Sequence, residues 1–207
     1  MPIPNTKDHI TQIAMQLFAE KGFDAVSVRE IASAADINVA LISYHFGSKE
    51  GLLQNIIENK ARMMNTVIRE IDADKSISEL DKIKKIIRHY VTTLITHREF
   101  HKVMVHEMLF SNRDELHTQA INTFTENIQC VAAIIKKGIR KGVFKKVDPE
   151  MCFSSILGSI HHFINASRLR TNIYATKSGK DPIHEKSFEQ RISTHLENMM
   201  TDHLLKP

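Results

Sequence analysis

A short segment near the N-terminus carries side chains suited to bind another molecule. Tyr44 and His45 each present a flat ring with a hydrogen-bonding group, and the residues before them are small or aliphatic. The candidate contact residues of this segment are Val39, Ala40, Leu41, Ser43, Tyr44 and His45. A short helix with such a compact exposed side can enter the major groove of DNA. We therefore treat this segment as a candidate DNA-reading element.

Enzymatic chemistry has no comparable support in the sequence. We find no nucleophile beside a general base, no glycine-rich phosphate loop and no pair of carboxylates at a useful spacing. The sequence therefore predicts a protein that is not an enzyme and that needs no cofactor.

Twelve histidines raise the possibility of a metal site. His97 and His101 stand four residues apart, which would place both on one face of a single helix. The intervening stretch Arg98–Phe100, however, has the character of a junction between helices, which would separate the two rings. We expect satisfied polar or interface histidines here and no metal site.

The candidate segment lies within a pattern of three short helices. Apolar residues from Ile10 to Phe18 recur at helical spacing, and this first helix ends at Lys21-Gly22. Ser27-Val28-Arg29-Glu30 is a capping box that starts a second helix. Asn38 is an N-cap for a third helix over residues 39–46. Together they predict a helix-turn-helix motif at about residues 27–46.

The remainder of the chain also has helical periodicity. Further helices are expected over residues 48–71, 78–96, 100–110, 116–141, 148–172 and 184–204. The sequence thus predicts an all-α protein of about nine helices, with no convincing strand. The expected boundary separates a DNA-binding domain at residues 1–50 from an effector-binding and dimerisation domain at residues 51–207.

Composition agrees with a helical, soluble protein. The 207 residues include only 7 Gly and 5 Pro, which argues against folds rich in tight turns. Two cysteines form no disulfide framework, and the longest apolar run, residues 130–135, is too short to span a membrane. Residues 1–9 lack the apolar stretch of a signal peptide. We expect a cytoplasmic location and no membrane association.

Three sequence blocks resemble the tetracycline-repressor (TetR) family of bacterial regulators. The blocks are Phe18-Ala19-Glu20-Lys21-Gly22-Phe23, Val28-Arg29-Glu30-Ile31-Ala32 and Tyr44-His45-Phe46-Gly47-Ser48-Lys49-Glu50-Gly51-Leu52-Leu53. They stand in the family's order and spacing across about residues 8–57. The rest of the chain is similar to the family only in its helix pattern.

The resemblance implies a dimer that reads adjacent major grooves of a pseudo-palindromic operator. By matching position, Ser27 and Arg29 approach phosphate or a base edge, and Val39, Ala40, Leu41 and Ser43 face the bases. Tyr44, His45 and Lys49 fall on backbone-contact positions; Lys49 begins a helix, where a cation opposes the helix dipole, so we expect an external anion beside it.

Two residues depart from the family pattern. Asp36 occupies a turn position that is usually glycine, but Asp tolerates a left-handed backbone better than most residues. Leu41 replaces a commonly polar residue, which points to thymine-methyl contacts or to recognition of DNA shape.

The net charge of +4 is unevenly distributed. Residues 1–60 hold five Lys or Arg and seven Asp or Glu, a net charge of −2. The basic excess lies in the C-terminal part, with a cluster at residues 136–146 that we interpret mainly as a solvated helix end, a second DNA contact being the alternative. We therefore expect modest non-specific affinity for DNA.

The C-terminal part is expected to bind an unknown small-molecule effector and a second copy of the chain. Candidate pocket residues are Met104, Met108, Phe110, Phe124, Ile128, Ile160 and Phe163. The homodimer is expected to form through the helices near 148–172 and 184–204. The predicted function is a transcriptional regulator, most simply a repressor released by its effector. The alternative is a helical ligand- or metal-sensing module with weak or no DNA binding.

Overall fold

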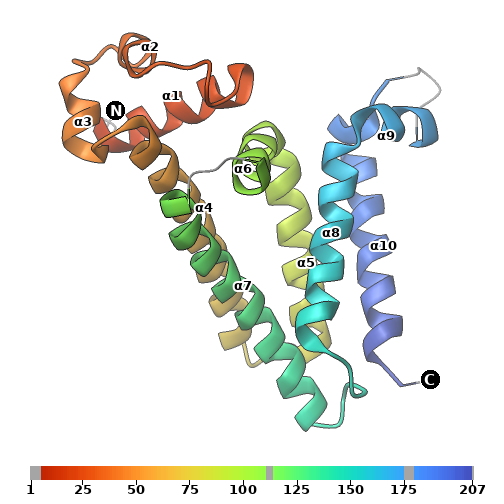
Figure 1. Ribbon diagram of the computed structural model, residues 1–207. Helices are drawn as coiled ribbons and strands as arrows, with labels where there is room; N and C mark the ends of the chain where they lie inside the picture. Colours follow the sequence, from red (N-terminus) through yellow and green to blue (C-terminus); the bar gives the residue numbers. More distant parts are fainter. Residues whose placement is uncertain (1–5, 111–113, 175–179, 207) are drawn as a thin grey trace. The chain divides into compact units, whose positions relative to one another are not determined.

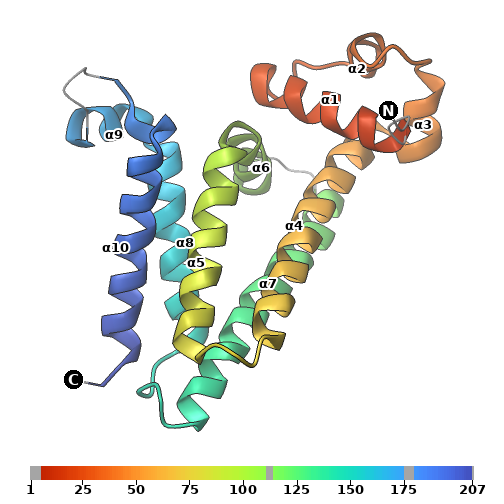
Figure 2. The same cartoon turned by 180° about the vertical axis from the view of Figure 1, so that it is seen from behind.

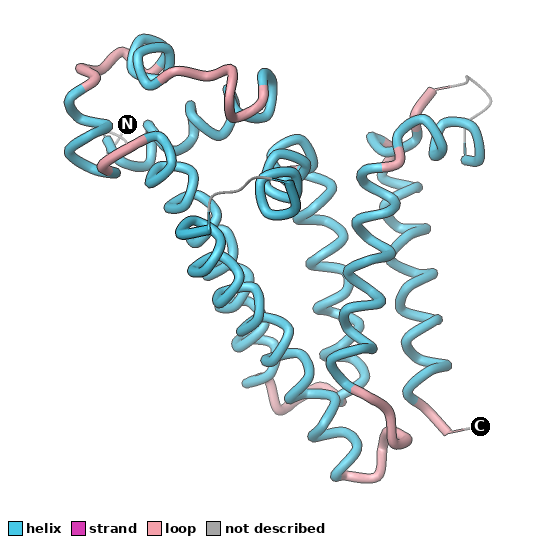
Figure 3. Tube along the Cα trace, viewed as in Figure 1, coloured by secondary structure: helices cyan, strands magenta, loops and turns pink. Residues whose placement is uncertain are grey.

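The computed structural model describes residues 6–110, 114–174 and 180–206, without the side chains of residues 106, 108–120 and 123. All regular structure in these ranges is helical (Figure 3). The helices are α1 (Thr6–Lys21), α2 (Val28–Ala34), α3 (Ala40–Phe46), α4 (Lys49–Ala73), α5 (Glu79–Thr96), α6 (Arg98–Phe110), α7 (Asp114–Arg140), α8 (Pro149–Asn165), α9 (Ser167–Tyr174), the 3₁₀ helix η1 (Pro182–His184) and α10 (Lys186–Leu204). The predicted all-α class is confirmed.

Local capping signals account for several helix starts. The Ser78 hydroxyl accepts a hydrogen bond from the Asp81 amide at the start of α5, at 3.1 Å. At the start of α8, the Asp148 carboxylate accepts from the Met151 amide at 3.0 Å, and Pro149 occupies the first turn. These side chains satisfy amides that an isolated helix start leaves without partners, so the predicted starts are confirmed.

The turn between α2 and α3 confirms the predicted role of Asp36. Its φ is 52°, the only positive φ at a non-glycine residue within the described ranges. The amide of Asp36 donates to the Ser33 carbonyl, and the Ile37 amide donates to the Ala32 carbonyl. These hydrogen bonds close α2 and redirect the chain into α3.

The chain divides into two compact units. The first contains Met1–Met63 and Glu99–Phe124, and the second contains Met64–Arg98 and Thr125–Pro207. The compact division therefore differs from the expected boundary at residue 50, because α4 and α6 contribute to the core of the first unit. The buried residues of that core are Ile10, Ala14, Phe18, Phe23, Val26, Ile31, Ala32, Ile42, Leu52, Leu53, Ile56, Ile57, Phe100 and Met104.

In the second unit, α5, α8 and α10 lie side by side (Figures 1 and 2). Isoleucines dominate their shared core, including Ile86, Ile156 and Ile192. Arg88 of α5 donates through Nε and Nη2 to both carboxylate oxygens of Glu197 on α10, at 2.6 and 2.7 Å. This bidentate ion pair links α10 to α5 at the edge of their shared core.

An ionic network connects the end of α4, the start of α5 and the end of α7. Lys82, only 2% exposed, donates to the Asp72 carbonyl oxygen at 2.6 Å. The buried carboxylate of Glu79 accepts from Lys141 at 2.5 Å. Burial alone would raise the pKa of Glu79, but Lys141, Lys82 and Lys137 together hold it below its ordinary value. Lysines of α5 and α7 thus neutralise the acids, so the charges can be buried.

Two glycines, Gly138 and Gly142, determine how α7 ends. Gly142 adopts φ 72°, and the amides of Val143 and Phe144 donate to the Gly138 carbonyl. The Phe144 ring then packs directly on Gly138, where a Cβ would lie 2.1 Å from a ring carbon. The predicted end of this helix is confirmed, and position 138 has no room for a side chain.

The prediction of one continuous helix over residues 148–172 is wrong, because the structure has two helices there. α8 ends at Asn165, and α9 begins at Ser167. Arg170, 3% exposed, donates to the carbonyls of Phe163 and Ile164 at the end of α8 and forms a bidentate pair with Asp181. The guanidinium therefore satisfies the carbonyls that a continuous helix would bond internally.

Among the described residues, no helix is long and apolar enough to cross a bilayer.

The left-handed turn at Asp36 gives a prediction about stability. Asp36→Val should lower the free energy of unfolding by about 1–2 kcal/mol, because a β-branched residue fits φ 52° poorly. Asp36→Gly should be neutral or stabilising. Ser33→Gly, within α2, is the matched control and should be destabilising by about 1 kcal/mol. Denaturation followed by circular dichroism would decide; equal effects of glycine at both positions would contradict the interpretation.

The Arg170–Asp181 pair gives a prediction about pH. Hydrogen bonds from Arg170 hold the pKa of Asp181 below its ordinary value of 3.8. The stabilisation is therefore complete above that value and is lost as the pH falls through the lowered pKa. Asp181→Asn should cost about 3 kcal/mol at pH 7, because Arg170 stays buried without its partner. The loss should shrink below about pH 4, whereas exposed Asp202→Asn should have little effect at either pH.

Candidate nucleic-acid interface

The candidate DNA-reading element is the helix α3. Ile42, 1% exposed, anchors α3 in the core of the first unit. The Asn38 side chain accepts from the Ala40 amide at 2.9 Å, and α3 begins at Ala40, one residue later than expected. At the other end, the Gly47 amide donates to the Ser43 carbonyl, and Gly47 adopts φ 76°. Both ends of this short helix are thereby defined.

Several of the predicted contact residues are exposed on α3 or just before it. Tyr44 is 81% exposed, the highest value among the large hydrophobic side chains in the described ranges, and Val39 is 40% exposed. Of the predicted residues, those exposed are Ser27, Arg29, Val39, Ala40, Ser43 and Tyr44, and those half-buried are Leu41, His45 and Lys49. The six exposed residues, which come from α2 and α3 and the positions just before them, are accessible to a partner.

Aromatic contacts fix the second half of α3. The Tyr44 and His45 rings meet edge-to-face with centroids 5.0 Å apart, and His45 and Phe46 are similarly arranged at 6.1 Å. Lys7 Nζ lies 5.5 Å from the Phe46 ring centroid. His45 thus supports the Tyr44 ring from the side while the Tyr44 hydroxyl end stays in solvent.

The start of α2 is capped differently from the predicted capping box. The Ser27 hydroxyl accepts from the Glu30 amide at 3.2 Å, as expected. The Glu30 carboxylate, however, pairs with Lys21 at 2.5 Å instead of reaching back to Ser27. This half of the prediction is wrong because the cation at the end of α1 is a stronger partner than a neutral amide. The pairing raises the pKa of Lys21 and lowers that of Glu30.

Lys49 has partners within the protein. Its amine donates to the carbonyl oxygens of Phe23 and Val26, each at 2.9 Å, and lies 4.2 Å from the Phe23 ring centroid. An external anion is therefore not needed to explain a cation at this helix start.

The basic cluster at the end of α7 also has internal partners. Lys136 pairs with Glu150 at 2.6 Å, Lys141 pairs with Glu79 at 2.5 Å, and Lys145 donates to the Asp202 carbonyl at 3.3 Å. These contacts agree with its interpretation as a solvated helix end.

The predicted effector residues are distributed over both hydrophobic cores. Met104 and Phe124 belong to the first, and Ile128, Ile160 and Phe163 belong to the second. The side chains of Met108 and Phe110 lie outside those that the structure describes. An effector pocket at these residues stays a prediction.

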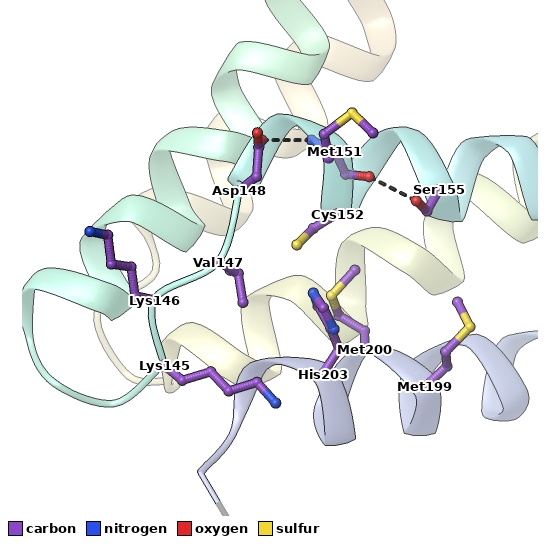
Figure 4. Close-up of a pocket in the computed structure, with 10 residues that line it drawn as sticks. All are labelled: Lys145, Lys146, Val147, Asp148, Met151, Cys152, Ser155, Met199, Met200 and His203. Atoms are coloured by element: carbon purple, nitrogen blue, oxygen red, sulfur yellow. Dashed lines mark hydrogen bonds between the residues drawn. The ribbon is translucent and has the colours of Figure 1, made fainter.

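A groove between α8 and α10 in the second unit is shown in Figure 4. It encloses about 590 Å³, and its lining residues are Lys145, Lys146, Val147, Asp148, Met151, Cys152, Ser155, Met199, Met200 and His203. Met151 is 64% exposed at its edge. The Cys152 thiol lies within it, and burial raises the pKa of that thiol. The sequence interpretation missed this groove, although the exposed Met151 stands on the same face as Ser155 and Gly158.

A second groove lies at the other end of the α8–α10 pair. It encloses about 540 Å³, and Phe163, Tyr174 and Phe188 contribute aromatic rings to it. Tyr174 lies 5.6 Å from Phe188 between ring centroids, and the Arg191 guanidinium lies 5.3 Å from the Tyr174 centroid. The exposed side of the α8–α10 pair is thus uneven and partly apolar.

The histidines do not form a metal site within the described ranges. No group of three His, Cys, Asp or Glu residues there could hold an ion. His97 is the C-cap residue of α5 and His101 is buried in α6, so the two histidines do not share one helix. The junction lies at His97, because the stretch Arg98–Phe100, where it was expected, belongs to α6.

Comparison with known proteins identifies both parts of the chain. Residues 10–56 match the family described as "Bacterial regulatory proteins, tetR family". Residues 76–165 match the family described as "Tetracyclin repressor-like, C-terminal domain". The first match covers α2, α3 and most of α1, together with the start of α4.

Curated relatives match over different lengths. YttP of Bacillus subtilis is 40% identical over 80 residues, which are 37% of this chain and 39% of that protein. The HTH-type transcriptional repressor NicS of Pseudomonas putida is 24% identical over 167 residues, 79% of this chain and 77% of that protein. The chain thus spans well under half the length of the first relative and about three quarters of the second.

Solved structures share the fold. The transcriptional regulator FadR from Bacillus subtilis, in complex with stearoyl-CoA, has a TM-score of 0.73 at 19% identity, covering 95% of this chain and 98% of that chain. GusR of Salmonella enterica has a TM-score of 0.72 at 22% identity, covering 98% and 96%.

Proposed function

Because the chain belongs to the TetR family of bacterial regulatory proteins, we propose that it is a DNA-binding transcriptional regulator that acts as a repressor. The observation that carries the proposal is the face of α3: Ile42 is buried while Tyr44 is 81% exposed. A large aromatic side chain held in solvent by a helix with both ends defined is suited to contact a partner. The family match supports double-stranded operator DNA as that partner.

The exposed groups indicate how the DNA would be recognised. Ser43 and Tyr44 supply hydroxyls, while Val39 and Ala40 supply apolar surface that suits the thymine methyl group. Arg29 at the start of α2 is exposed and suits a phosphate. Few hydrogen-bonding groups face the bases, so DNA shape should contribute to specificity.

A second copy of the chain completes the proposed DNA-binding form. The α8 face toward solvent carries Met151, Ser155 and Gly158, and the α10 face beside it carries Met199. A Cβ added at Gly158 would meet no atom within 4 Å in the single chain. Small residues here would let the helices of two copies approach closely, and the α8–α10 grooves would receive the partner's side chains.

We further propose that a small-molecule effector bound in the C-terminal part releases the operator. Support comes from FadR of Bacillus subtilis, whose solved structure contains stearoyl-CoA in the same fold. Of the residues predicted above to line its pocket, the second unit contributes Ile128, Ile160 and Phe163. Native mass spectrometry of the purified protein, before and after organic extraction, would test for such a ligand.

One observation favours a second candidate, a ligand-sensing module that binds DNA weakly or not at all. Residues 1–60 carry a net charge of −2. Binding through phosphates must weaken steeply as salt rises, so a salt titration separates the two candidates.

The exposure of Tyr44 gives a direct test of the DNA proposal. On operator DNA found by footprinting beside the protein's own gene, Tyr44→Ala should weaken binding by about 10- to 100-fold, through loss of its contacts. The melting temperature should not change, because the Tyr44 side chain is 81% exposed. Met63→Ala is the control, since Met63 is 64% exposed on α4 of the same unit, and it should change neither. Absence of a roughly two-fold symmetric footprint would refute the proposal.

Gly158 gives a test of the proposed dimer. Gly158→Arg should raise the dimer dissociation constant by about 100-fold or more, because the new side chain occupies the space of the partner helix. The monomer has room for it, so helical content should be unchanged. Light scattering after size-exclusion chromatography gives the mass. Gln129→Arg, exposed on α7, should stay dimeric; a dimeric Gly158→Arg would place the interface elsewhere.

A further inference from the structure

Lys49 is the first residue of α4, and its amine lies on the turn that precedes α2. Two of its three N–H groups donate to main-chain oxygens, those of Phe23 and Val26. The Val26 amide donates to the same Phe23 carbonyl at 3.3 Å, which closes the turn around the amine. The oxygens of one tight turn therefore converge on a single cation.

The two residues whose carbonyls hold the amine have buried apolar side chains. Phe23 is 2% exposed and Val26 is 1% exposed. The Phe23 ring lies 4.2 Å from the amine and packs on Phe18, with ring centroids 5.1 Å apart. A cation held by two carbonyls and an aromatic face in such surroundings is strongly localised. The same carbonyls offset the unfavourable position of a cation at a helix N-terminus.

The contact joins the two ends of the helix-turn-helix. Ser27, which follows Val26, is the N-cap of α2, and α3 ends at Phe46, shortly before Lys49. The hydrogen bond between Lys49 and Val26 therefore closes a ring of chain that contains α2, the Asp36 turn and α3. Closing the ring restricts how far α2 and α3 can move from the start of α4.

We infer that Lys49 is a positioning residue: its amine clasps the helix-turn-helix into one rigid element, and it does not act as a phosphate contact. The inference rests on the proposed DNA binding, for which a rigid α3 lowers the cost of ordering on binding. Arg29 differs in kind. It is exposed, and within the part of the chain that the structure describes no carboxylate pairs with it.

The test compares Lys49→Met with Arg29→Met in the full-length chain. Lys49→Met should speed hydrogen exchange of amides 28–46 by about tenfold. It should also weaken operator binding by about tenfold, with the affinity calculated for the fraction of the protein that is competent to bind DNA. The slope of log affinity against log salt should stay as in the wild type. Arg29→Met should lower that slope by about one and leave exchange unchanged.

Two further variants separate positioning from charge and from stability. Lys49→Arg keeps the charge but places a planar fork where two carbonyls converge, so affinity should stay reduced; full recovery with normal exchange would overturn the inference. Ile10→Val destabilises the same core without touching the clasp, and it should bind DNA normally below its melting temperature. Should Lys49→Met lack wild-type helical content, Lys49→Gln takes its place.

The outcomes separate this inference from the proposed function. A salt slope lowered by about one in Lys49→Met, with unchanged exchange, would make Lys49 a phosphate contact and refute the clasp. Unchanged affinity and exchange would also refute it. If the wild type binds no DNA, the proposed function fails, while faster exchange of amides 28–46 in Lys49→Met still supports the clasp.

Discussion

A three-helix motif of about 40 residues buries too little apolar surface to be stable by itself. In this chain, helices outside the motif contribute the additional buried apolar surface. Ile56 and Ile57 of α4 and Phe100 and Met104 of α6 join Ile42 in one buried cluster. The position of α3 therefore depends on side chains contributed by later helices. The unusual exposure of Tyr44 is possible only because the opposite face of α3 is anchored so well.

Local signals allowed much of the fold to be predicted. The caps Ser78 and Asp148 and the left-handed Asp36 follow from side-chain chemistry within a few residues, and the structure contains all three. The break between α8 and α9 could not be predicted, because it depends on a buried pair between Arg170 and Asp181. Apolar periodicity continues through such a break and carries no sign of a distant carboxylate.

In the candidate site, too, features set by local sequence could be predicted, and contacts between distant residues could not. The exposed face of α3 follows from helical spacing once Ile42 is taken as its inward residue. The partners of Glu30 and Lys49 do not follow from spacing, since Lys21 and the carbonyl oxygens of Phe23 and Val26 come together only in the folded unit. Main-chain oxygens leave no trace in a residue pattern, so a lysine near a DNA-reading helix looks like a phosphate ligand.

The internal use of Lys21 and Lys49 has a consequence for how such a protein searches a chromosome. Sliding along DNA depends on loosely held cations that exchange between successive phosphates. With these two amines engaged within the protein and residues 1–60 carrying a net charge of −2, such contacts are few. If the chain binds DNA as proposed, we expect it to spend little time on unrelated sequence, and the bulk of the genome should then sequester little of the protein.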